Sequence, residues 1–235
     1  PAPGQWPRLL AVCLLNGVLH FGLSFWALRA SGNLASPAIV MQSYVPIAAL
    51  LAWWLLGERF GWRTGAGIGI SFMGVLVLGL DPLVLQNPTA LGVMLVSAAF
   101  LSLGTVLMRG IAGQTGLSMQ GWTAVLGVGP LFAISLAFEP MAVPAFNGSS
   151  WVAWAGVGYS ALISSALGHG LYFGLVQRHP IAVVTPYLLL VPVLAVALGI
   201  LFYGDRPGPR LFLGGAMVLG GVLAIALRAK TKHRQ

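Results

Sequence analysis

The sequence predicts an all-α polytopic membrane protein, and three observations lead to this prediction. Hydrophobic residues make up 58% of the chain and charged residues only 7%, with a mean hydropathy of +0.91, whereas soluble domains carry about 25% charged residues. The apolar runs are of the order of 20 residues, the length that an α-helix needs to cross a bilayer. No run shows the alternation over about ten residues that is typical of a membrane barrel.

Eight membrane-spanning helices are predicted in order along the chain. The seven breaks between them are short segments rich in Gly, Pro, Asn or charge, which in order are ASGN, GERFGWR, DPLVLQNP, GIAGQTG, EPMAVPAFNGSS, QRHP and GDRPGPR. The helices between these segments cover residues 9–28, 34–56, 64–80, 90–108, 119–138, 151–176, 181–203 and 210–227. An even number of spans places both ends of the chain on one side of the membrane.

The positive charges are distributed unequally between the two sides. Nine of the twelve Lys and Arg residues fall on the side of the termini, and three, Arg29, Arg206 and Arg210, fall on the other. Cytoplasmic segments carry the excess of Lys and Arg in membrane proteins, so both termini are predicted to be cytoplasmic, in an inner (plasma) membrane. The eight Trp residues lie at or near predicted helix ends, as interfacial anchors do.

Part of the sequence is repeated. His20 and His169 begin the similar stretches HFGLSFWALR and HGLYFGLVQR, and VPIAALLAWWLLGER recurs as VPVLAVALGILFYGDR, each followed by a glycine-rich helix. The first three predicted helices therefore correspond to the last three. Equivalent helices are five apart and so cross the membrane in opposite directions, which is the inverted repeat of many secondary transporters. By symmetry, two further helices are expected before Pro1, ten in all.

These blocks resemble a known family. LASPAIVMQSYVPIAALLAWWLLGER followed by TGAGIGISFMGVLVLG, and VVTPYLLLVPVLAVALGILFYGDR followed by FLGGAMVLGGVLAI, resemble the two halves of EamA-type transporters in the drug/metabolite transporter superfamily. The phrase LLVPVLAVA is similar to the O-acetylserine/cysteine exporter group. The resemblance implies that residues 1–80 are the last three helices of a first repeat, 81–89 the connection, 90–228 a complete second repeat and 229–235 a basic cytoplasmic tail. Asp205 departs from the family, which usually has Glu there.

Two polar stripes are the candidate substrate-binding residues. Asn16 and His20 lie one turn apart on the first predicted helix, and Ser165 and His169 lie one turn apart on the sixth. Polar side chains in hydrocarbon cost free energy, so each stripe must face protein or water. Contact with a substrate and an interhelical hydrogen bond worth about 1 kcal/mol are both open readings, and we interpret the stripes, together with Tyr187, as substrate-binding. A histidine titrating near pH 6.5 could also accept a coupling proton.

Two prolines are interpreted as hinges. Pro46 and Pro192 lie near the middle of their helices and remove the helical hydrogen bonds to the carbonyl groups of Gln42 and Leu188. Gln42 is therefore expected to offer a side-chain amide and a freed carbonyl group to a substrate. Kinks that serve packing alone are the alternative.

Several function classes are disfavoured. No acid and no lysine lies in the middle of a span, and a carrier of sugar phosphates or lipophilic cations would need one. Glu58 and Asp205 end helices beside arginines, which predicts local ion pairs or caps. No HExxH, GxSxG or P-loop pattern is present, so an intramembrane enzyme is disfavoured. The scattered arginines form no basic face for nucleic acid, and the single Cys13 supports no cysteine-based metal site.

The sequence therefore predicts a secondary transporter, not an enzyme, that exports a small neutral or zwitterionic metabolite by alternating access. The resemblance indicates an amino acid or a derivative as the substrate. Export of other small metabolites or drugs, and a non-transporting membrane scaffold, are the alternatives. The expected partners are the small-molecule substrate, the lipid bilayer and a proton as the candidate coupling ion, and no cofactor or metal is expected.

Overall fold

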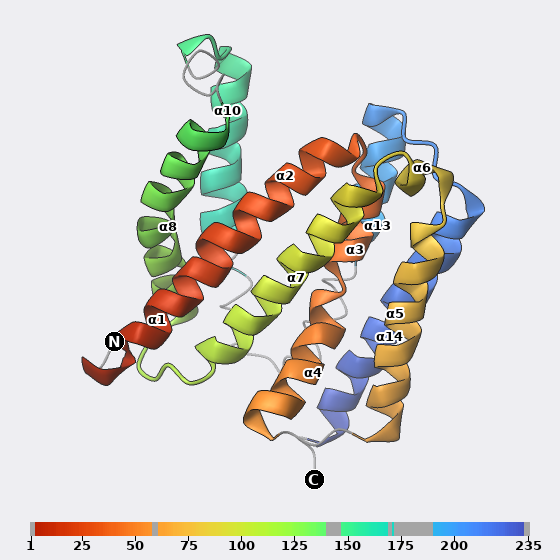
Figure 1. Cartoon of the computed structure of the whole chain (residues 1–235), viewed down its shortest axis with the longest axis horizontal. Coiled ribbons are helices and arrows are strands. Elements are labelled where there is room, and N and C mark those ends of the chain that lie inside the picture. The colour runs from red at the N-terminus through yellow and green to blue at the C-terminus, as the bar shows by residue number, and fades with distance from the viewer. Residues whose placement is uncertain (1–2, 58–60, 140–146, 169–170, 172–189, 233–235) are drawn as a thin grey trace.

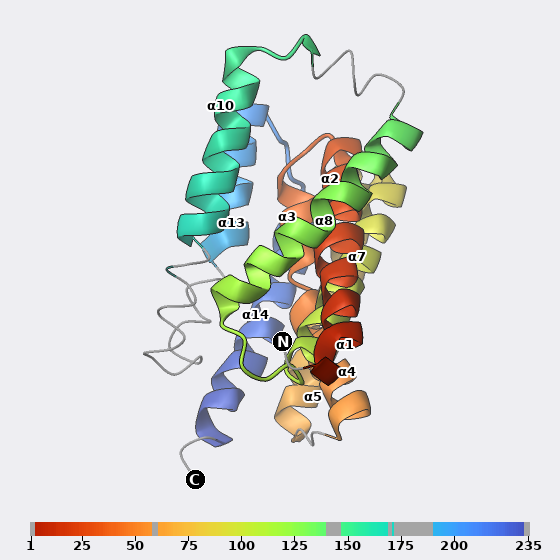
Figure 2. The ribbon, with the colours of Figure 1, turned by 90° about the vertical axis from the view of Figure 1, so that its left-hand side faces the viewer.

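The computed structural model describes residues 3–57, 61–139, 147–168, 171 and 190–232. Within these residues the chain forms helices and connections and no strand. The long helices lie side by side, and the first and last described helices begin and end, respectively, at the same end of the bundle (Figures 1 and 2). The predicted all-α class is therefore confirmed.

The described residues form helical elements in the following chain order. From the N-terminus they are η1 (Pro3–Gln5), α1 (Trp6–Val12), η2 (Cys13–His20), α2 (Phe21–Ser31), α3 (Ala35–Met41), α4 (Tyr44–Leu56), α5 (Trp62–Gly79) and α6 (Pro82–Leu85). They continue as α7 (Pro88–Met108), α8 (Gly116–Phe138), α10 (Trp151–Tyr159), η3 (Ser160–Gly168), α13 (Leu190–Leu198), η4 (Gly199–Tyr203) and α14 (Pro209–Lys232). The element η1 is a 3-10 turn, whereas η2, η3 and η4 are π-helical.

Six helices in the described part of the chain are long and apolar enough to cross a membrane. They are Trp6–Ser31, Ala35–Leu56, Trp62–Gly79, Pro88–Met108, Gly116–Phe138 and Pro209–Leu227. Their bounds agree with six of the predicted spans to within about three residues, the usual accuracy of such boundaries. The other two predicted spans, 151–176 and 181–203, extend into residues outside the described ones, and their described parts are helical.

Local sequence explains where several helices begin and end. The side chains of Asn87, Thr115 and Ser150 each accept a hydrogen bond from the backbone N–H three residues further on, at the starts of α7, α8 and α10. Such caps satisfy amide groups that have no partner in the first turn. Gly57 and Gly204, with φ of 66° and 68°, end α4 and η4 in the left-handed conformation, which glycine adopts without steric cost.

The helices α5 and α14 pack along each other with their backbones in close contact (Figure 1). Two glycine pairs form the contact, Gly67 with Gly221 and Gly74 with Gly214. A Cβ atom on Gly74 would lie 2.6 Å from the Gly214 carbonyl oxygen, and one on Gly214 would lie 2.5 Å from the Gly74 carbonyl oxygen. Between the pairs, the Ser71 hydroxyl donates to the Val218 carbonyl oxygen at 3.2 Å. The order of these contacts makes the two helices antiparallel.

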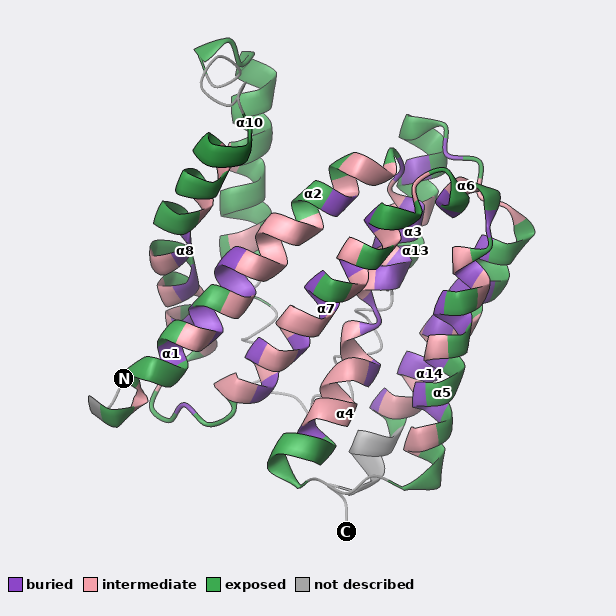
Figure 3. Ribbon diagram, viewed as in Figure 1, coloured by how far each residue is buried: buried purple, intermediate pink, exposed green. Residues whose placement is uncertain are grey.

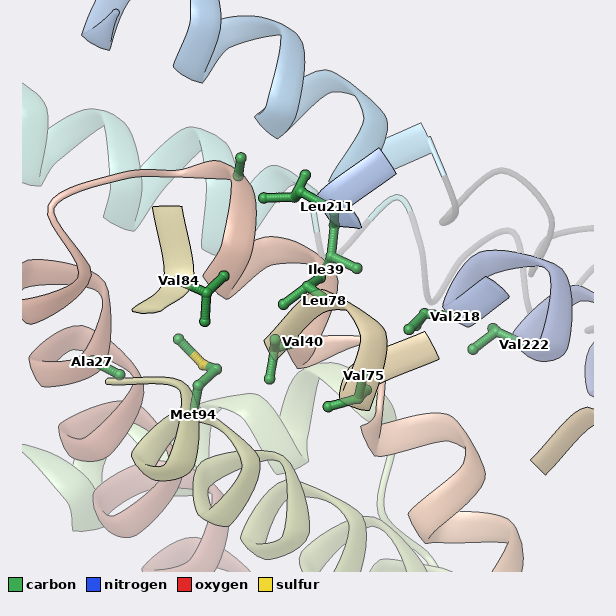
Figure 4. Packing of buried hydrophobic residues seen from close by; sticks show 11 residues of the cluster. Ala27, Ile39, Val40, Val75, Leu78, Val84, Met94, Leu211, Val218 and Val222 are labelled. Atoms are coloured by element: carbon green, nitrogen blue, oxygen red, sulfur yellow. The ribbon is translucent and has the colours of Figure 1, made fainter. Parts of the chain in front are cut away.

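A buried apolar cluster surrounds one end of this helix pair. It joins side chains from α2, α3, α5, α6, α7 and α14, among them Ala27, Ile39, Val40, Val75, Leu78, Val84, Met94, Leu211, Val218 and Val222 (Figure 4). Elsewhere large apolar side chains are exposed, above all on α8 and α10 (Figure 3). Helices that are apolar on every side are typical of membrane spans, so we interpret this exposed apolar surface as facing lipid.

Candidate functional site

The first polar stripe lies on the π-helical element η2. The helix Trp6–Ser31 is continuous, but its hydrogen bonding widens to the π type over Cys13–His20, which includes Asn16 and His20. The sequence predicts a regular α-helix here, so the wider turn is a difference from the prediction. Such turns are rare and occur frequently at functional sites.

His20 pairs with Ser97 of the neighbouring helix α7. The ring Nδ1 lies 2.8 Å from Ser97 Oγ, and the Ser97 hydroxyl donates to the His20 carbonyl oxygen at 2.9 Å. Ser97 is fully buried, whereas His20 is half-buried and its ring lies 5.1 Å, centroid to centroid, from that of Phe21. The interhelical hydrogen bond considered for His20 is therefore present, and one hydroxyl group contacts both the backbone and the ring of the histidine.

Asn16 packs against the same helix α7. Its side chain is 8% exposed, and its Oδ1 forms no hydrogen bond with any described residue. The amide group lies directly over the backbone of Gly104, where even a methyl group would overlap it. A buried polar atom without a partner costs about 1–3 kcal/mol. Asn16 Oδ1 is thus an acceptor for which the described residues supply no donor, and a donor from a substrate would remove this cost.

The second predicted span is interrupted at Gln42 and Ser43, between α3 and α4. Pro46 has no N–H group that could bond to the Gln42 carbonyl oxygen. The expectation that this oxygen is free is nevertheless wrong, because it accepts a hydrogen bond from the Val45 N–H at 3.1 Å. The turn tightens, with the Ser43 N–H bonding to the Val40 carbonyl oxygen at 2.9 Å. Only the side chain of Gln42 remains as a candidate ligand.

Both side chains at this interruption are buried. Gln42 is 9% exposed and Ser43 is fully buried, and Ser43 Oγ forms no hydrogen bond within the described part of the chain. Helix α7 reaches this point as well, since the Ser102 hydroxyl lies 2.8 Å from the Tyr44 carbonyl oxygen. Helix α7 therefore contacts η2 through Ser97 and the interruption through Ser102.

The second polar stripe falls only partly within the described residues. Ser165 lies on the π-helical element η3 and is half-buried, whereas His169 and Tyr187 lie outside the described residues. The element η3 is described up to Gly168, the residue before His169, and η2 ends at His20. Each of the two histidine phrases is therefore preceded by a π-helical turn.

Pro192 is fully buried in α13, and the Leu188 carbonyl group that it was expected to free lies outside the described residues. The stretch from Pro192 to Asp205 is one residue longer than that from Pro46 to Glu58. Within it, η4 is π-helical, whereas α4 is α-helical throughout. A π turn accommodates more residues than an α turn, so η4 takes up the additional residue of the second copy.

Two buried carboxylates cap helices that are distant in sequence. Asp205 Oδ2 accepts hydrogen bonds from the N–H groups of Leu34 at 3.0 Å and Ala35 at 3.3 Å, at the start of α3. Asp81 Oδ2 accepts one from the Leu211 N–H at 2.9 Å, at the start of α14. A negative charge is favourable at a helix N-terminus. Of the two options considered for Asp205, the cap is the one present, and its partner is a helix of the first half of the chain.

A shallow groove lies between α2 and α7, close in sequence to His20 and Ser97. It encloses about 280 Å³ and is lined by apolar groups of Leu23, Thr89, Gly92, Val93 and Val96. Neither His20 nor Ser97 lines it. Its chemistry suits an apolar group and not a charged one, because it offers no polar partner.

Sequence analysis missed Ser97, Ser102 and Gly104 of α7 and the caps made by Asp81. A signal was available in SAAFLSLGT, where small polar residues interrupt an apolar span, but their partners depend on which helices pack together. No three of the His, Cys, Asp and Glu side chains in the described residues lie close enough to share a metal ion. The arrangement that is present offers uncharged hydrogen-bonding groups inside an apolar bundle.

Comparison with known proteins extends this description. The profile of the EamA-like transporter family matches residues 1–80 and 88–227. The chain is 28% identical over 225 residues to a protein named probable amino-acid metabolite efflux pump from Escherichia coli K12, covering 88% of this chain and 75% of that protein. It is 28% identical over 232 residues to the probable terminal-alkyne amino-acid exporter of Streptantibioticus cattleyicolor, covering 97% of this chain and 75% of that protein.

No solved structure gives a significant match to the chain. The family profile nevertheless spans nearly all of the sequence, including η2, α7 and the interruption before Pro46. Its description agrees with the apolar spanning helices and with the resemblance in the repeated blocks. The chain therefore belongs to the EamA-like transporter family.

Proposed function

We propose that this chain is the transporting part of a secondary transporter that exports a small neutral or zwitterionic metabolite, an amino acid or a derivative. The observation that carries the proposal is the group of hydrogen-bonding side chains at η2 and α7, inside helices that are predominantly apolar; these side chains are Asn16, His20 and Ser97. Buried polar groups in a membrane mark substrate pathways. The printed names of two relatives, an amino-acid metabolite efflux pump and an amino-acid exporter, support an amino acid as the substrate class.

The charge distribution supports an uncharged or zwitterionic substrate. In the described chain the acidic and arginine side chains belong to residues at helix ends or in connections, such as Arg29 and Glu139, whose side chains lie 3.9 Å apart. The candidate pathway holds amide, imidazole and hydroxyl groups instead. A substrate with a net charge would need an opposite charge in the low-dielectric interior.

The proposed architecture is an inverted repeat of eight spans in this chain, with both termini in the cytoplasm and ten spans in the full-length protein. The contact between α5 and α14 supports it. In the sequence repeat, each residue of α5 corresponds to the residue of α14 that lies 147 positions later. Gly67 therefore corresponds to Gly214, Gly74 to Gly221 and Ser71 to Val218, so each of these two glycines of α5 contacts the equivalent of the other one. This is the pattern of two equivalent helices packed around a two-fold axis that passes near Ser71 and Val218.

Alternating access is proposed to use Pro46 and Pro192 as hinges. Both prolines are buried, and the helix is interrupted just before Pro46, at Gln42 and Ser43 between α3 and α4. Asn16, His20 and Gln42 would line the substrate path in the first repeat, with Ser165, His169 and Tyr187 as their counterparts in the second. Such broken helices at membrane depth are typical of transporter binding sites.

Uptake into inverted vesicles tests the proposal. Vesicles from cells that express the full-length protein are given a panel of labelled amino acids, with and without an imposed proton gradient. Saturable uptake is expected, and a dependence on the gradient would identify the proton as coupling ion. His20→Ala and Gln42→Ala should lower the rate at unchanged expression. The control is Thr105→Val on α7, because among the described residues the Thr105 hydroxyl donates to the Leu101 carbonyl oxygen of its own helix.

The other function classes give different results in the same vesicles. Saturable uptake of drugs or other metabolites but of no amino acid would move the proposal to another substrate class of the family. If no compound shows saturable uptake, the transporter proposal is contradicted and a scaffold is favoured. Hydrolysis or group transfer without net transport would favour an enzyme.

A further inference from the structure

We infer that Ser97 is a positioning residue that holds the neutral His20 ring with its proton on Nδ1, so that Nε2 accepts a hydrogen bond from an ammonium group of the substrate. This inference rests on the proposed function for its substrate, whereas the placement of the proton rests on geometry alone. No role of Ser97 is expected from the sequence or from the family resemblance.

The placement of the proton follows from the hydrogen-bonding capacity of serine. A serine hydroxyl has one hydrogen and two lone pairs. The Ser97 hydrogen is directed to the His20 carbonyl oxygen, 2.9 Å away, because two oxygen atoms at this distance repel each other without a hydrogen between them. Ser97 Oγ can then only accept in its 2.8 Å contact with Nδ1. In a neutral imidazole one nitrogen carries the hydrogen and the other is an acceptor, so Nε2 is left with a lone pair.

The surroundings hold the ring in this state. Ser97 is fully buried on helix α7, and its hydroxyl donates to the backbone carbonyl oxygen of His20, the residue that it orients. The Phe21 ring lies beside the imidazole at an interplanar angle of 45°, and it stacks in turn on Phe25 with 5.9 Å between centroids. The Nε2 atom forms no hydrogen bond with a described residue. Imidazole orientation and tautomer are set in this way by the partner of the other nitrogen.

The acceptor at Nε2 selects the chemistry of the substrate. One helical turn away on the same element, Asn16 Oδ1 is a second acceptor without a described partner. Lone pairs of this kind attract a donor and repel a carboxylate. An ammonium group has three donors and forms charge-assisted hydrogen bonds, which are stronger than those of a neutral hydroxyl. An acceptor of this kind at His20 therefore fits the amino end of an amino acid.

Two substitutions of His20 distinguish the role of Nδ1 from that of Nε2. In His20→Asn the side-chain NH₂ takes the place of Nδ1–H, so the bond to Ser97 is kept while the acceptor at Nε2 is lost. In His20→Gln the longer amide reaches the place of Nε2 while the bond to Ser97 is lost. Ser97→Ala removes the positioning group, and Ser97→Thr keeps a hydroxyl. Thr105→Val is the matched control on α7, since within the described part of the chain the Thr105 hydroxyl donates to the Leu101 carbonyl oxygen of the same helix.

The first experiment measures transport by the full-length protein with two labelled probes, S-methyl-L-cysteine and 3-(methylthio)propionate, which lacks the ammonium group. His20→Asn should raise KM for the amino acid by about 10- to 100-fold, the loss of one charge-assisted hydrogen bond, at nearly unchanged maximal rate. Ser97→Ala should raise it about three- to tenfold and Ser97→Thr should restore it. Equal KM values of the wild type for both probes, or an unchanged KM in His20→Asn, would overturn recognition of the ammonium group.

The second experiment needs no substrate. Ring ¹⁵N spectra of the purified full-length protein distinguish a protonated from an unprotonated imidazole nitrogen, and the signals of His20 among the four histidines of this chain are those lost in His20→Asn. A protonated Nδ1 and an unprotonated Nε2 are expected in the wild type, with a mixture in Ser97→Ala. A proton on Nε2, or an unchanged spectrum in Ser97→Ala, would overturn the role of Ser97 whatever the transport assay shows.

Discussion

The contact between α5 and α14 makes a sharp prediction about Gly214. A methyl group at this position would lie 2.5 Å from the Gly74 carbonyl oxygen, 2.6 Å from the Leu78 backbone nitrogen and 2.8 Å from Leu78 Cβ. Two of these atoms belong to the backbone and cannot rotate away. The substitution Gly214→Ala must therefore push the two helices apart.

The cost follows from the distance that has to be gained. Heavy atoms in contact prefer a separation of about 3.5 Å, so α14 must move by about 1 Å, and a gap of this size removes a quarter to a half of each contact energy of about 0.1–0.2 kcal/mol. If about 40 atom pairs are affected, as many as one buried leucine makes, the loss is about 2 kcal/mol. This value lies within the range of about 1–3 kcal/mol for overpacked cores.

Unfolding of the full-length protein in mixed detergent micelles measures this loss. The matched control is Gly220→Ala on the same helix, because a methyl group there meets no atom within 4 Å. The control should be neutral or more stable by up to about 1 kcal/mol, since alanine favours the helix more than glycine does. If Gly214→Ala and Gly220→Ala unfold with the same free energy, the close packing of α5 on α14 is wrong, and with it the main support for the two-fold axis.

Three further predictions concern other contacts. Gly104→Ala places a methyl group on the Asn16 amide and should cost about 1–3 kcal/mol of unfolding free energy, whereas Gly92→Ala on the same helix meets no atom within 4 Å; equal stabilities would contradict the contact. Asp205→Ala leaves the N–H groups of Leu34 and Ala35, at the start of α3, without their acceptor and should cost about 1–2 kcal/mol in the same assay. A variant as stable as the wild type would show that the cap is not formed. Pro46→Ala supplies an N–H group for the Gln42 carbonyl oxygen and should slow transport about tenfold at unchanged expression if Pro46 is a hinge; an unchanged rate would leave it as a packing kink.

Hydropathy and breaker residues were sufficient to place most helices. The span predicted at 34–56 is observed at Ala35–Leu56, and the one predicted at 90–108 is observed at Pro88–Met108. These boundaries depend on local composition, because apolar length, proline and glycine act within the segment itself. The π-helical turns η2 and η4 were not predicted, because apolar periodicity does not distinguish an α turn from a π turn within one long apolar helix.

For each contact in the candidate site, the sequence predicted one of the two residues and not its partner. Asn16 and His20 stand out as polar residues in an apolar helix, but Ser97 and Gly104 are ordinary residues of α7 until the packing of η2 on α7 is known. The Gln42 carbonyl group shows the same limit, since its new partner, the Val45 N–H, depends on how the backbone tightens around Pro46. Sequence thus identifies residues that need a partner, and the fold decides which residue supplies it.

Counterflow in liposomes tests the central claim most directly, because it requires no coupling ion and no other cellular component. The purified full-length protein is reconstituted into liposomes loaded with an unlabelled amino acid and then given a trace of the labelled one outside. The account predicts a transient accumulation of label that is reduced in His20→Asn and retained in Thr105→Val. If correctly inserted wild-type protein gives no accumulation with any amino acid of the panel, this chain does not carry an amino-acid transporter.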